Sequence, residues 1–336
     1  MASFSARGYV ALSEGYASHP FHALDRDWPE SNCYADVWIE LLHSRGLEVS
    51  ATLGGALAND FEGDQWTFFK PTTSELFRLY GLQVEELMIW RDFERHLLAQ
   101  SALGRVPLVE VDGFFLPDTE GQSYRRSHAK TTIGVDQIDA KAETLRYFHN
   151  RGRWTLSGAD YRAIMRIDPV PSDADMIPYC EIVKLDRLIK RSPESLHGVA
   201  LDLLNMHVAR CPVENPIPRY AATVERDLVE IAESNPDDYD EYAFAAIRQC
   251  GVGFRFAADH LEWLGAREAG WKKPAEAFAT ISSLSSMLVL KMARIAHSGR
   301  MRDLSATFLD MERAWEHGMT ATRNLLPEPQ TPNSRR

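Results

Sequence analysis

The chain has 336 residues, 45% of them hydrophobic and 25% charged, which is enough apolar material for a globular protein of about two domains. Its 48 acidic and 37 basic residues give a net charge of -11, and the absence of a Lys/Arg block argues against a nucleic-acid partner. No apolar run has the length of a signal peptide or a membrane span, and the four scattered cysteines lack CxxC spacing. We therefore predict a cytoplasmic protein with reduced thiols, no membrane partner and no bound cofactor.

The first predicted helix begins at Cys33. Asn32 is a good N-cap residue, apolar residues recur with helical spacing from Val37 to Leu42, and Gly46 supplies the stop. Cys33 therefore lies in the first turn of this helix.

The rest of the first half mixes helices and strands. Residues 65–70 read as a strand, Thr72 and Glu75 form a capping box for a helix ending near Gly81, and a second helix is expected from Val84 to about Ser101. Strands are then predicted at 106–112, 114–117, 128–136 and 144–150. These strands should form a small antiparallel sheet.

After residue 168 the strand signals end. Helices are predicted at about 180–191, 194–210, 219–234, 239–265, 274–297 and 303–323. The fold class is thus α+β, with a sheet-containing domain over 1–170, a helical bundle over 171–325 and a disordered tail over 326–336.

The position of Cys33 makes it a candidate nucleophile. A helix N-terminus carries partial positive charge and unpaired N–H groups, which favour a thiolate and can hold an oxyanion. The alternative is that Cys33 is a small buried hydrophobe, as free cysteines often are. No comparable support exists for a metal site, because His19 and His22 stand without a further ligand cluster.

A hairpin between the last two strands offers a base and an orienting group. If 128–136 and 144–150 turn around Asp139, opposed residue numbers sum to about 278, which places His128 opposite Asn150. A slip of one residue would substitute His149 or Arg151 and reverse the face. Each residue also has a structural reading, His128 as an exposed strand residue and Asn150 as a turn residue. Together with Cys33 they form a Cys-His-Asn triad.

The order of these features resembles papain-like cysteine enzymes. The block from Pro107 to Pro117, followed by Tyr124, His128 and Gly134-Val135-Asp136, is similar to the N-terminal domain of the butirosin-biosynthesis acyltransferases, relatives of the bacteriocin-leader-processing peptidases. This match covers about residues 30–160. The chain as a whole resembles the bacterial family catalogued as domain of unknown function 1839.

The resemblance implies that Cys33 accepts an acyl group, that His128 is the general base and that Asn150 orients it, a place that is often Asp in the related acyltransferases. The implied reaction moves an acyl or aminoacyl group, from a thioester on the phosphopantetheine arm of a carrier protein, to a small-molecule amine or hydroxyl acceptor in secondary metabolism. An acidic carrier protein needs a basic docking surface, for which Arg125, Arg126 and Lys130 are candidates; they also fit an ordinary solvated strand edge.

One departure weakens the peptidase reading. Papain-like peptidases have a Gln oxyanion donor six residues before the nucleophile, whereas this chain has Asp27, which accepts hydrogen bonds when ionised. The backbone N–H of Cys33 and a group such as Asn32 would then hold the oxyanion. The alternatives are a cysteine peptidase or amidase, and a catalytically inactive papain-like module that binds a peptide or carrier protein.

Overall fold

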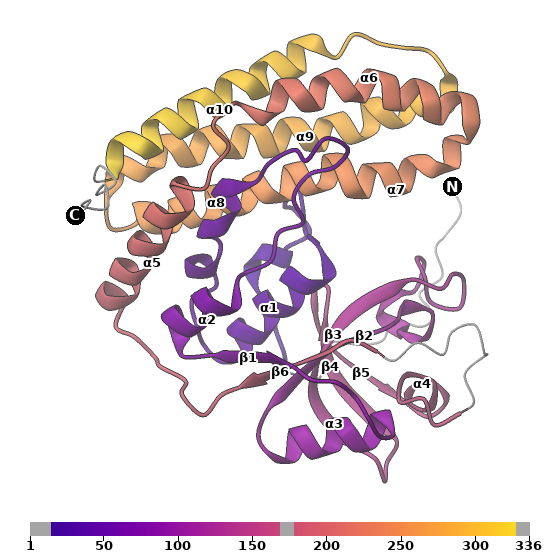
Figure 1. Ribbon diagram of the computed structural model, residues 1–336. Helices are drawn as coiled ribbons and strands as arrows, with labels where there is room; N and C mark the ends of the chain where they lie inside the picture. The colour runs from indigo at the N-terminus through magenta and orange to yellow at the C-terminus, as the bar shows by residue number, and fades with distance from the viewer. Residues whose placement is uncertain (1–14, 169–177, 327–336) are drawn as a thin grey trace, which may run out of the picture. The chain divides into compact units, whose positions relative to one another are not determined.

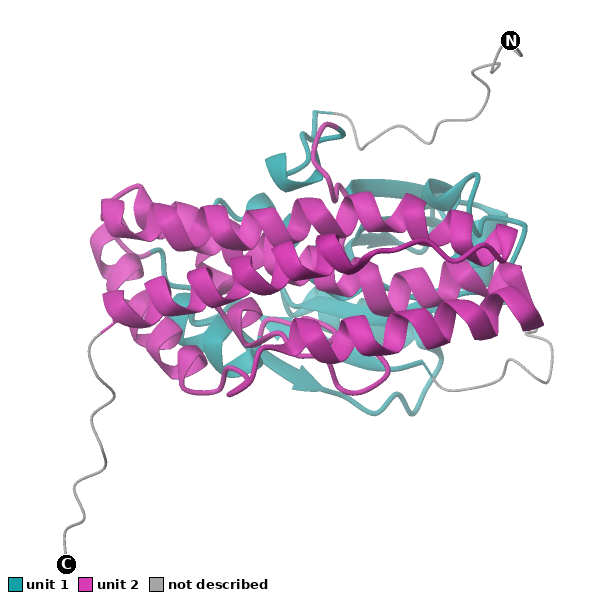
Figure 2. Cartoon of the chain, turned by 90° about the horizontal axis from the view of Figure 1, so that it is seen from above, with its two compact units in different colours: residues 1–24, 32–47, 72–190 teal, residues 25–31, 48–71, 191–336 magenta. Residues whose placement is uncertain are grey.

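A computed structural model describes residues 15–168 and 178–326, and these divide into two compact units (Figure 2). The sheet unit comprises residues up to 24, 32–47 and 72–190. The helical unit comprises 25–31, 48–71 and the residues from 191 onward. The helical unit thus takes two segments from the first quarter of the chain. Most of the predicted disordered tail, 327–336, lies outside the described residues.

The sheet unit is built on six antiparallel strands in the order β1-β6-β2-β3-β4-β5, which confirms the α+β class. Their bounds are β1 Gln83–Glu86, β2 Val106–Asp112, β3 Lys130–Asp139, β4 Thr144–His149, β5 Gly152–Ser157 and β6 Cys180–Lys184.

Helices cover both faces of this sheet (Figure 1). On one face α1 (Cys33–Ser44) packs on β3 and β4. Gly134 of β3 allows that approach, because a Cβ there would lie 2.9 Å from Cγ1 of Val37. The other face packs against α3 (Phe93–Ala102) and α4 (Ala159–Ile164) in one apolar core that includes Phe93, Leu97, Val109, Ile133, Tyr147 and Tyr161.

The termini of the two early helices were predicted correctly. Asn32 caps α1 and Gly46 follows it with φ 65°. α2 (Thr73–Tyr80) begins after Thr72, whose side chain accepts the N–H of Glu75. Capping depends on residues next to each other in sequence, so the sequence was sufficient here.

Other predicted elements were wrong. The strand expected at 65–70 is replaced by an isolated bridge between Phe61 and Trp66, and the strand expected at 114–117 falls in two 3-10 turns, Gly113–Phe115 and Pro117–Thr119. The segment expected as a helix from Val84 begins with β1 and is helical from Phe93, where α3 starts. The segment expected as a helix at 180–191 is β6 followed by a turn. β6 pairs with β1 and β2, which are more than 70 residues away, and β5 was missed altogether. Long-range pairing overrode the local helix propensity of these segments.

The helical unit contains α5 Pro193–Val208, α6 Pro216–Ser234, α7 Tyr239–Ala243, α8 Gln249–Gly265, α9 Lys272–Ser298 and α10 Ser305–Leu325. A π-helical turn, Phe244–Arg248, joins α7 to α8. Segment 25–31 packs on α8, where the indole of Trp28 lies against Gly251 and donates from Nε1 to Ser282 Oγ at 3.0 Å. The five helical regions predicted from 194 onward are therefore confirmed.

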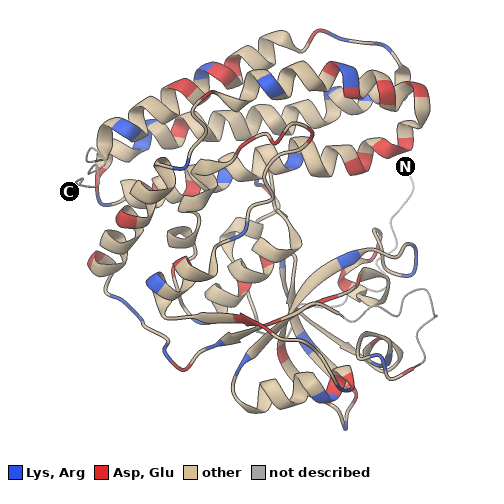
Figure 3. Ribbon diagram, in the orientation of Figure 1, with Lys and Arg blue, Asp and Glu red and all other residues tan. Residues whose placement is uncertain are grey.

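Among the described helices one segment, 269–298, has the length and apolar composition to cross a membrane. This is weak evidence, because core helices of water-soluble proteins also meet these criteria. Ten residues of α9, including Phe278, Ile281 and Leu288, are buried in the protein. Acidic and basic side chains are interspersed in both units (Figure 3).

Candidate functional site

Cys33 is the first residue of α1. The side chain of Asn32 accepts the N–H of Ala35 at 2.9 Å, and the carbonyl of Asn32 accepts the N–H of Asp36 at 3.0 Å. The amide of Cys33 belongs to the first turn, where N–H groups have no acceptor within the helix. The oxyanion role of Asn32 stays a prediction, and its side-chain oxygen already serves as the cap.

The thiol of Cys33 faces the sheet. Its Sγ lies 3.8 Å from the hydroxyl Oγ1 of Thr132 in β3, and the residue is half-buried. In the described part of the chain no hydrogen bond joins Cys33 to an imidazole. The group beside the sulfur is therefore a hydroxyl, which cannot act as a base at neutral pH.

The other three thiols are in apolar surroundings. Cys180, Cys211 and Cys250 are buried, and burial raises the pKa of each to about 12. At neutral pH they are thiols rather than thiolates, and reagents do not reach them. Cys33 is thus the cysteine whose exposure permits chemistry.

His128 precedes β3 and is held by Asp112. Its Nδ1 lies 2.5 Å from Asp112 Oδ2, its ring stacks on Phe114 with centroids 4.5 Å apart, and its side chain is 73% exposed. Asp112 thereby orients the imidazole and leaves Nε2 facing outward. A base with an orienting group is present, and the orienting group is a carboxylate on β2.

The predicted pairing of His128 with Asn150 is wrong. β3 and β4 pair Gly134 with Phe148 and Asp139 with Thr144, so opposed numbers sum to 282–283 rather than 278. Asn150 lies in the β4–β5 turn with φ 45°, a left-handed conformation that Asn tolerates.

His128 is also displaced from the thiol along the strand. Four residues of extended chain separate His128 from Thr132, about 13 Å between their Cα atoms. Even numbers on β3 share the face toward α1, as Thr132 and Gly134 show through Cys33 and Val37. His128 lies two residues before β3, so this alternation does not assign its side chain to a face, and among the described residues no hydrogen bond joins it to Cys33.

A second polar network, missed in the sequence, lies on the opposite face. Thr131 Oγ1 is 2.8 Å from His149 Nε2, and His149 Nδ1 is 2.6 Å from Asp118 Oδ2. Tyr147 donates to Asp118 Oδ1 at 2.5 Å, and burial together with Asp118 raises the pKa of this phenol. These distances resemble those of a catalytic triad, in which a hydroxyl (Thr131), an imidazole (His149) and a carboxylate (Asp118) are joined by hydrogen bonds. His149 is only 1% exposed, so the network stabilises the core rather than meeting a substrate.

The proposed basic docking residues are mostly paired within the chain. Arg125 forms an ion pair with Asp160, and Lys130 Nζ lies 2.7 Å from Glu110 Oε1. Arg126 donates a hydrogen bond to the carbonyl of Gly121 at 2.9 Å. This contact does not neutralise the positive charge of Arg126, because a carbonyl carries no net charge. The three residues do not form an unpaired basic surface.

Two further observations bear on cofactors and on Asp27. Within residues 15–168 and 178–326, no group of three or more His, Cys, Asp or Glu side chains is arranged to hold a metal ion.

Asp27 belongs to the helical unit, where its Oδ2 accepts a hydrogen bond from Ser283 Oγ at 2.7 Å. Asp27 is thus an acceptor, as its chemistry predicts.

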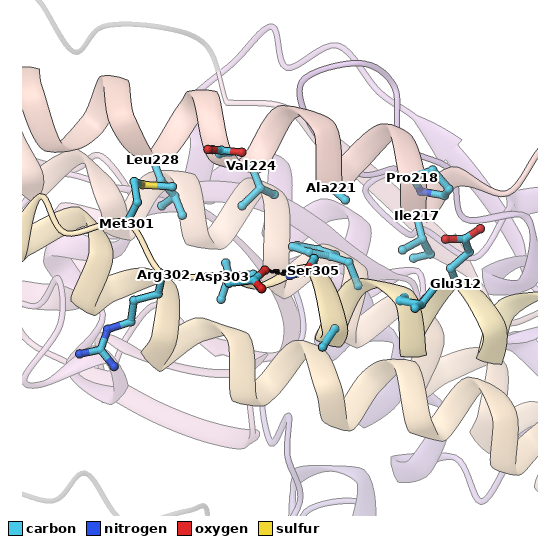
Figure 4. A pocket seen from close by; sticks show the side chains of 15 residues that line it. Ile217, Pro218, Ala221, Val224, Leu228, Met301, Arg302, Asp303, Ser305 and Glu312 are labelled. Atoms are coloured by element: carbon cyan, nitrogen blue, oxygen red, sulfur yellow. Dashed lines mark hydrogen bonds between the residues drawn. The ribbon is translucent and has the colours of Figure 1, made fainter.

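The helical unit has an elongated groove of about 930 Å³ between α6 and α10 (Figure 4). Ile217, Ala221, Val224 and Leu228 line one wall at helical spacing, and Phe308 lies on the other. The groove is largely apolar, and its size falls in the range of ligand sites.

Comparison with family models identifies both halves of the chain. The DUF1839 N-terminal domain matches residues 17–185, and the DUF1839 C-terminal domain matches residues 194–324. No curated protein matches the chain. The unmatched residues 186–193 fall where the sheet unit gives way to α5. With a half-exposed thiol at the start of α1 and a helical C-terminal unit, the chain belongs to the DUF1839 family.

Proposed function

We propose that the sheet unit is a papain-like domain that transfers an acyl or aminoacyl group through Cys33, from a thioester to an amine or hydroxyl acceptor. One observation carries the proposal. Cys33 is half-buried at the capped N-terminus of α1, whereas burial raises the pKa of the other three thiols to about 12. The N–H groups of the first turn of this helix have no acceptor within the helix and can hold an oxyanion beside the sulfur.

The reaction has two half-reactions. The Cys33 thiolate, whose proton has passed to solvent, forms a bond to the acyl carbon, the donor C–S bond breaks, and the donor leaves as a thiolate that later takes up a proton from solvent. The acceptor nitrogen or oxygen then attacks the acyl-Cys33, the carbon–sulfur bond breaks, and the acceptor's proton passes to the general base and from it to the Cys33 sulfur. N–H groups of the first turn of α1 hold the oxyanion in both steps.

The thiol's surroundings favour a thioester donor over a peptide. A thiolate with a pKa of about 8.5 leaves without protonation, whereas an amine leaving group needs a general acid beside the nucleophile. The neighbour of Cys33 is the Thr132 hydroxyl, 3.8 Å away. This arrangement supports acyl transfer more than the peptidase or amidase alternative.

His128 is the base that we assign to the acceptor half-reaction. Asp112, 2.5 Å from its Nδ1, orients the ring and leaves Nε2 to take the acceptor's proton. The proposal requires His128 to approach Cys33 when substrates bind, since about 13 Å of strand separates it from Thr132. In this proposal Asp112, and not Asn150, orients the imidazole of His128.

A carrier protein with a phosphopantetheine arm is the donor that the resemblance to the butirosin-biosynthesis acyltransferases implies. Docking of an acidic carrier has limited support, because Arg125 and Lys130 are paired with Asp160 and Glu110. We therefore base the test on the thioester itself and not on the carrier.

A second candidate is a papain-like module that binds a peptide or carrier protein without catalysis. The observation in its favour is that Cys33 Sγ lies beside the Thr132 hydroxyl, and that among residues 15–168 and 178–326 no hydrogen bond joins it to an imidazole. In this case the thiol would be a remnant of an ancestral nucleophile.

Incubation of the protein with an acyl N-acetylcysteamine thioester, followed by intact-mass and peptide analysis, separates the two candidates. Acyl transfer predicts one acyl adduct on Cys33, absent in Cys33→Ala and discharged by an added amine. In His128→Ala the adduct should still form and its discharge should slow by about 10²–10⁴-fold. A wild-type protein that forms no adduct would support the binding module.

A further inference from the structure

The packing of α1 on β3 holds the hydroxyl of Thr132 against the sulfur of Cys33. Cys33 and Val37 are one helical turn apart, about 6 Å along the axis of α1. Thr132 and Gly134 are two residues apart, about 6.6 Å along β3. Cys33 Sγ lies 3.8 Å from Thr132 Oγ1, and a Cβ at Gly134 would lie 2.9 Å from Cγ1 of Val37. The helix therefore meets the strand at two successive levels, and the first level brings the thiol to the hydroxyl.

Thr132 is a rigid residue. It lies within β3, which has β2 and β4 as its neighbours in the sheet, and it is 8% exposed. Its branched side chain has few accessible rotamers. The hydroxyl is thus fixed beside Cys33 before a substrate binds, as electrostatic stabilisation of a transition state requires.

The proton of this hydroxyl is not used within the described part of the chain. A threonine hydroxyl has one O–H donor and two acceptor lone pairs. In its one hydrogen bond among the described residues, Cys33 Sγ donates and Thr132 Oγ1 accepts. Glu110 is the cross-strand neighbour of Thr132, and its Oε1 accepts instead from Lys130 Nζ at 2.7 Å. The Thr132 hydroxyl can therefore donate to a group that is attached to the sulfur.

Acylation places such a group there. When the Cys33 sulfur attacks an acyl carbon it no longer carries a proton, so its hydrogen bond to Thr132 is lost. At the same moment the carbonyl oxygen of the substrate, two bonds from Sγ, becomes an oxyanion. A donor 3.8 Å from the sulfur can reach this oxygen at the distance of about 2.7–3.1 Å that an oxyanion-hole donor needs.

We propose that the Thr132 hydroxyl is a side-chain donor of the oxyanion hole and acts together with N–H groups of the first turn of α1. This inference rests on the acyl transfer proposed for Cys33 and adds a catalytic residue to it. As the bond from Sγ to the acyl carbon forms, an electron pair of the C=O bond moves to the oxygen. Thr132 donates a hydrogen bond to that oxygen and keeps its own proton. The C=O bond forms again when the C–S bond of the donor breaks.

Two reactions of the same sulfur separate this role from a structural one. Acylation by an acyl N-acetylcysteamine thioester passes through an oxyanion, whereas alkylation by iodoacetamide displaces iodide and forms no oxyanion. A donor to the oxyanion therefore affects the first reaction only. A hydroxyl that only positions the thiol, or only supports the packing of α1, affects both.

The experiment measures the rate at which each reagent modifies Cys33 in the full chain, by mass spectrometry. Thr132→Val removes the hydroxyl and keeps the shape of the side chain. Its acylation should be about 10²–10³-fold slower than in the wild type, and its alkylation should proceed at the wild-type rate. Thr132→Ser keeps a hydroxyl and should recover most of the lost acylation rate. Thr155→Val is the matched control, because Thr155 is an exposed threonine of β5 in the same unit, and both of its rates should equal those of the wild type.

Circular dichroism checks that each variant is folded, and Thr132→Ala gives the same comparison if Thr132→Val does not fold. Equal acylation of wild type and Thr132→Val would overturn the role of Thr132 and leave acyl transfer through Cys33 in place. So would a Thr132→Val variant that is slowed equally in both reactions, or a Thr132→Ser variant acylated as slowly as Thr132→Val. A wild-type protein that forms no acyl adduct would instead overturn the acyl transfer itself, and the role of Thr132 with it.

Discussion

The contact between Trp28 and Gly251 makes a sharp prediction about the helical unit. A Cβ added at Gly251 would lie 2.2 Å from Cζ2 and 2.5 Å from Cε2 of the Trp28 indole. Ordinary carbon contacts are about 3.5–4.0 Å, so the rigid ring would have to move by more than about 1 Å. That movement would break the 3.0 Å hydrogen bond from Nε1 to Ser282 Oγ.

The expected cost of Gly251→Ala follows from these terms. Overpacking costs about 1–3 kcal/mol and the lost hydrogen bond about 0.5–1.5 kcal/mol, whereas exchanging a helical Gly for Ala returns about 0.5–1 kcal/mol. The net loss is about 0.5–4 kcal/mol. For a unit of this size the melting temperature should fall by about 2–4 °C per kcal/mol.

Thermal unfolding followed by circular dichroism measures this loss. Gly198→Ala in α5 is the control, since nothing lies within 4 Å of a Cβ at that position, and it should leave stability equal or slightly higher. Adding Trp28→Leu to Gly251→Ala should relieve the clash, so that the double variant loses less than the sum of the two single changes. If Gly251→Ala proved as stable as Gly198→Ala, the packing of segment 25–31 on α8 would be refuted.

Two further predictions concern buried groups of the sheet unit. Asp118→Ala leaves His149 and Tyr147 buried without their acceptor, and chemical denaturation should show a loss of about 3–5 kcal/mol; a loss below about 1 kcal/mol would contradict the buried network. Burial, with a smaller effect of Arg91, lowers the pKa of His96 in the folded protein. Below the ordinary pKa of about 6.5, His96 is therefore protonated in the unfolded chain while it is still neutral in the folded chain. Stability from this group is complete above pH 6.5 and declines as the pH falls, and His96→Gln should flatten the free energy of unfolding between pH 7 and 5 relative to wild type. Equal slopes in the two proteins would show that His96 titrates alike in both states.

The position of Cys33 could be predicted because its determinants are local. Asn32, the apolar spacing of α1 and Gly46 fix the two ends of one helix, and a thiol at its first residue follows directly. The alternation of β3 was also readable, since Thr131 and Thr132 do point to opposite faces.

The partner of His128 could not be predicted, because two small features moved the register. The hairpin turn spans 140–143, after Asp139, whose side chain accepts the N–H groups of Lys141 and Ala142. The bulge at Asp136 adds one more residue. The centre of the turn lies two to three residues later in the sequence than expected. Because the numbers of two opposed residues sum to twice the number at the centre of the turn, this sum rises by four to five. Asp112, which holds His128, lies on β2. This strand is outside the β3–β4 hairpin from which the partner of His128 was predicted.

The strands β1 and β6 illustrate a second limit. Gln83–Glu86 is acidic and short, and Cys180–Lys184 is followed by residues with good helix propensity. Their strand conformation comes from pairing with each other and with β2. Nothing within either segment signals a partner so far away in the sequence.

The central claim is that Cys33 alone among the four cysteines is an accessible nucleophile. Iodoacetamide labelling of the folded protein at pH 7, with the fraction modified at each cysteine measured over time by peptide mass spectrometry, tests this claim most directly. We expect Cys33 to be modified well before Cys180, Cys211 and Cys250, whose pKa values of about 12 keep them protonated. Modification of Cys33 no faster than that of the three buried thiols would contradict it.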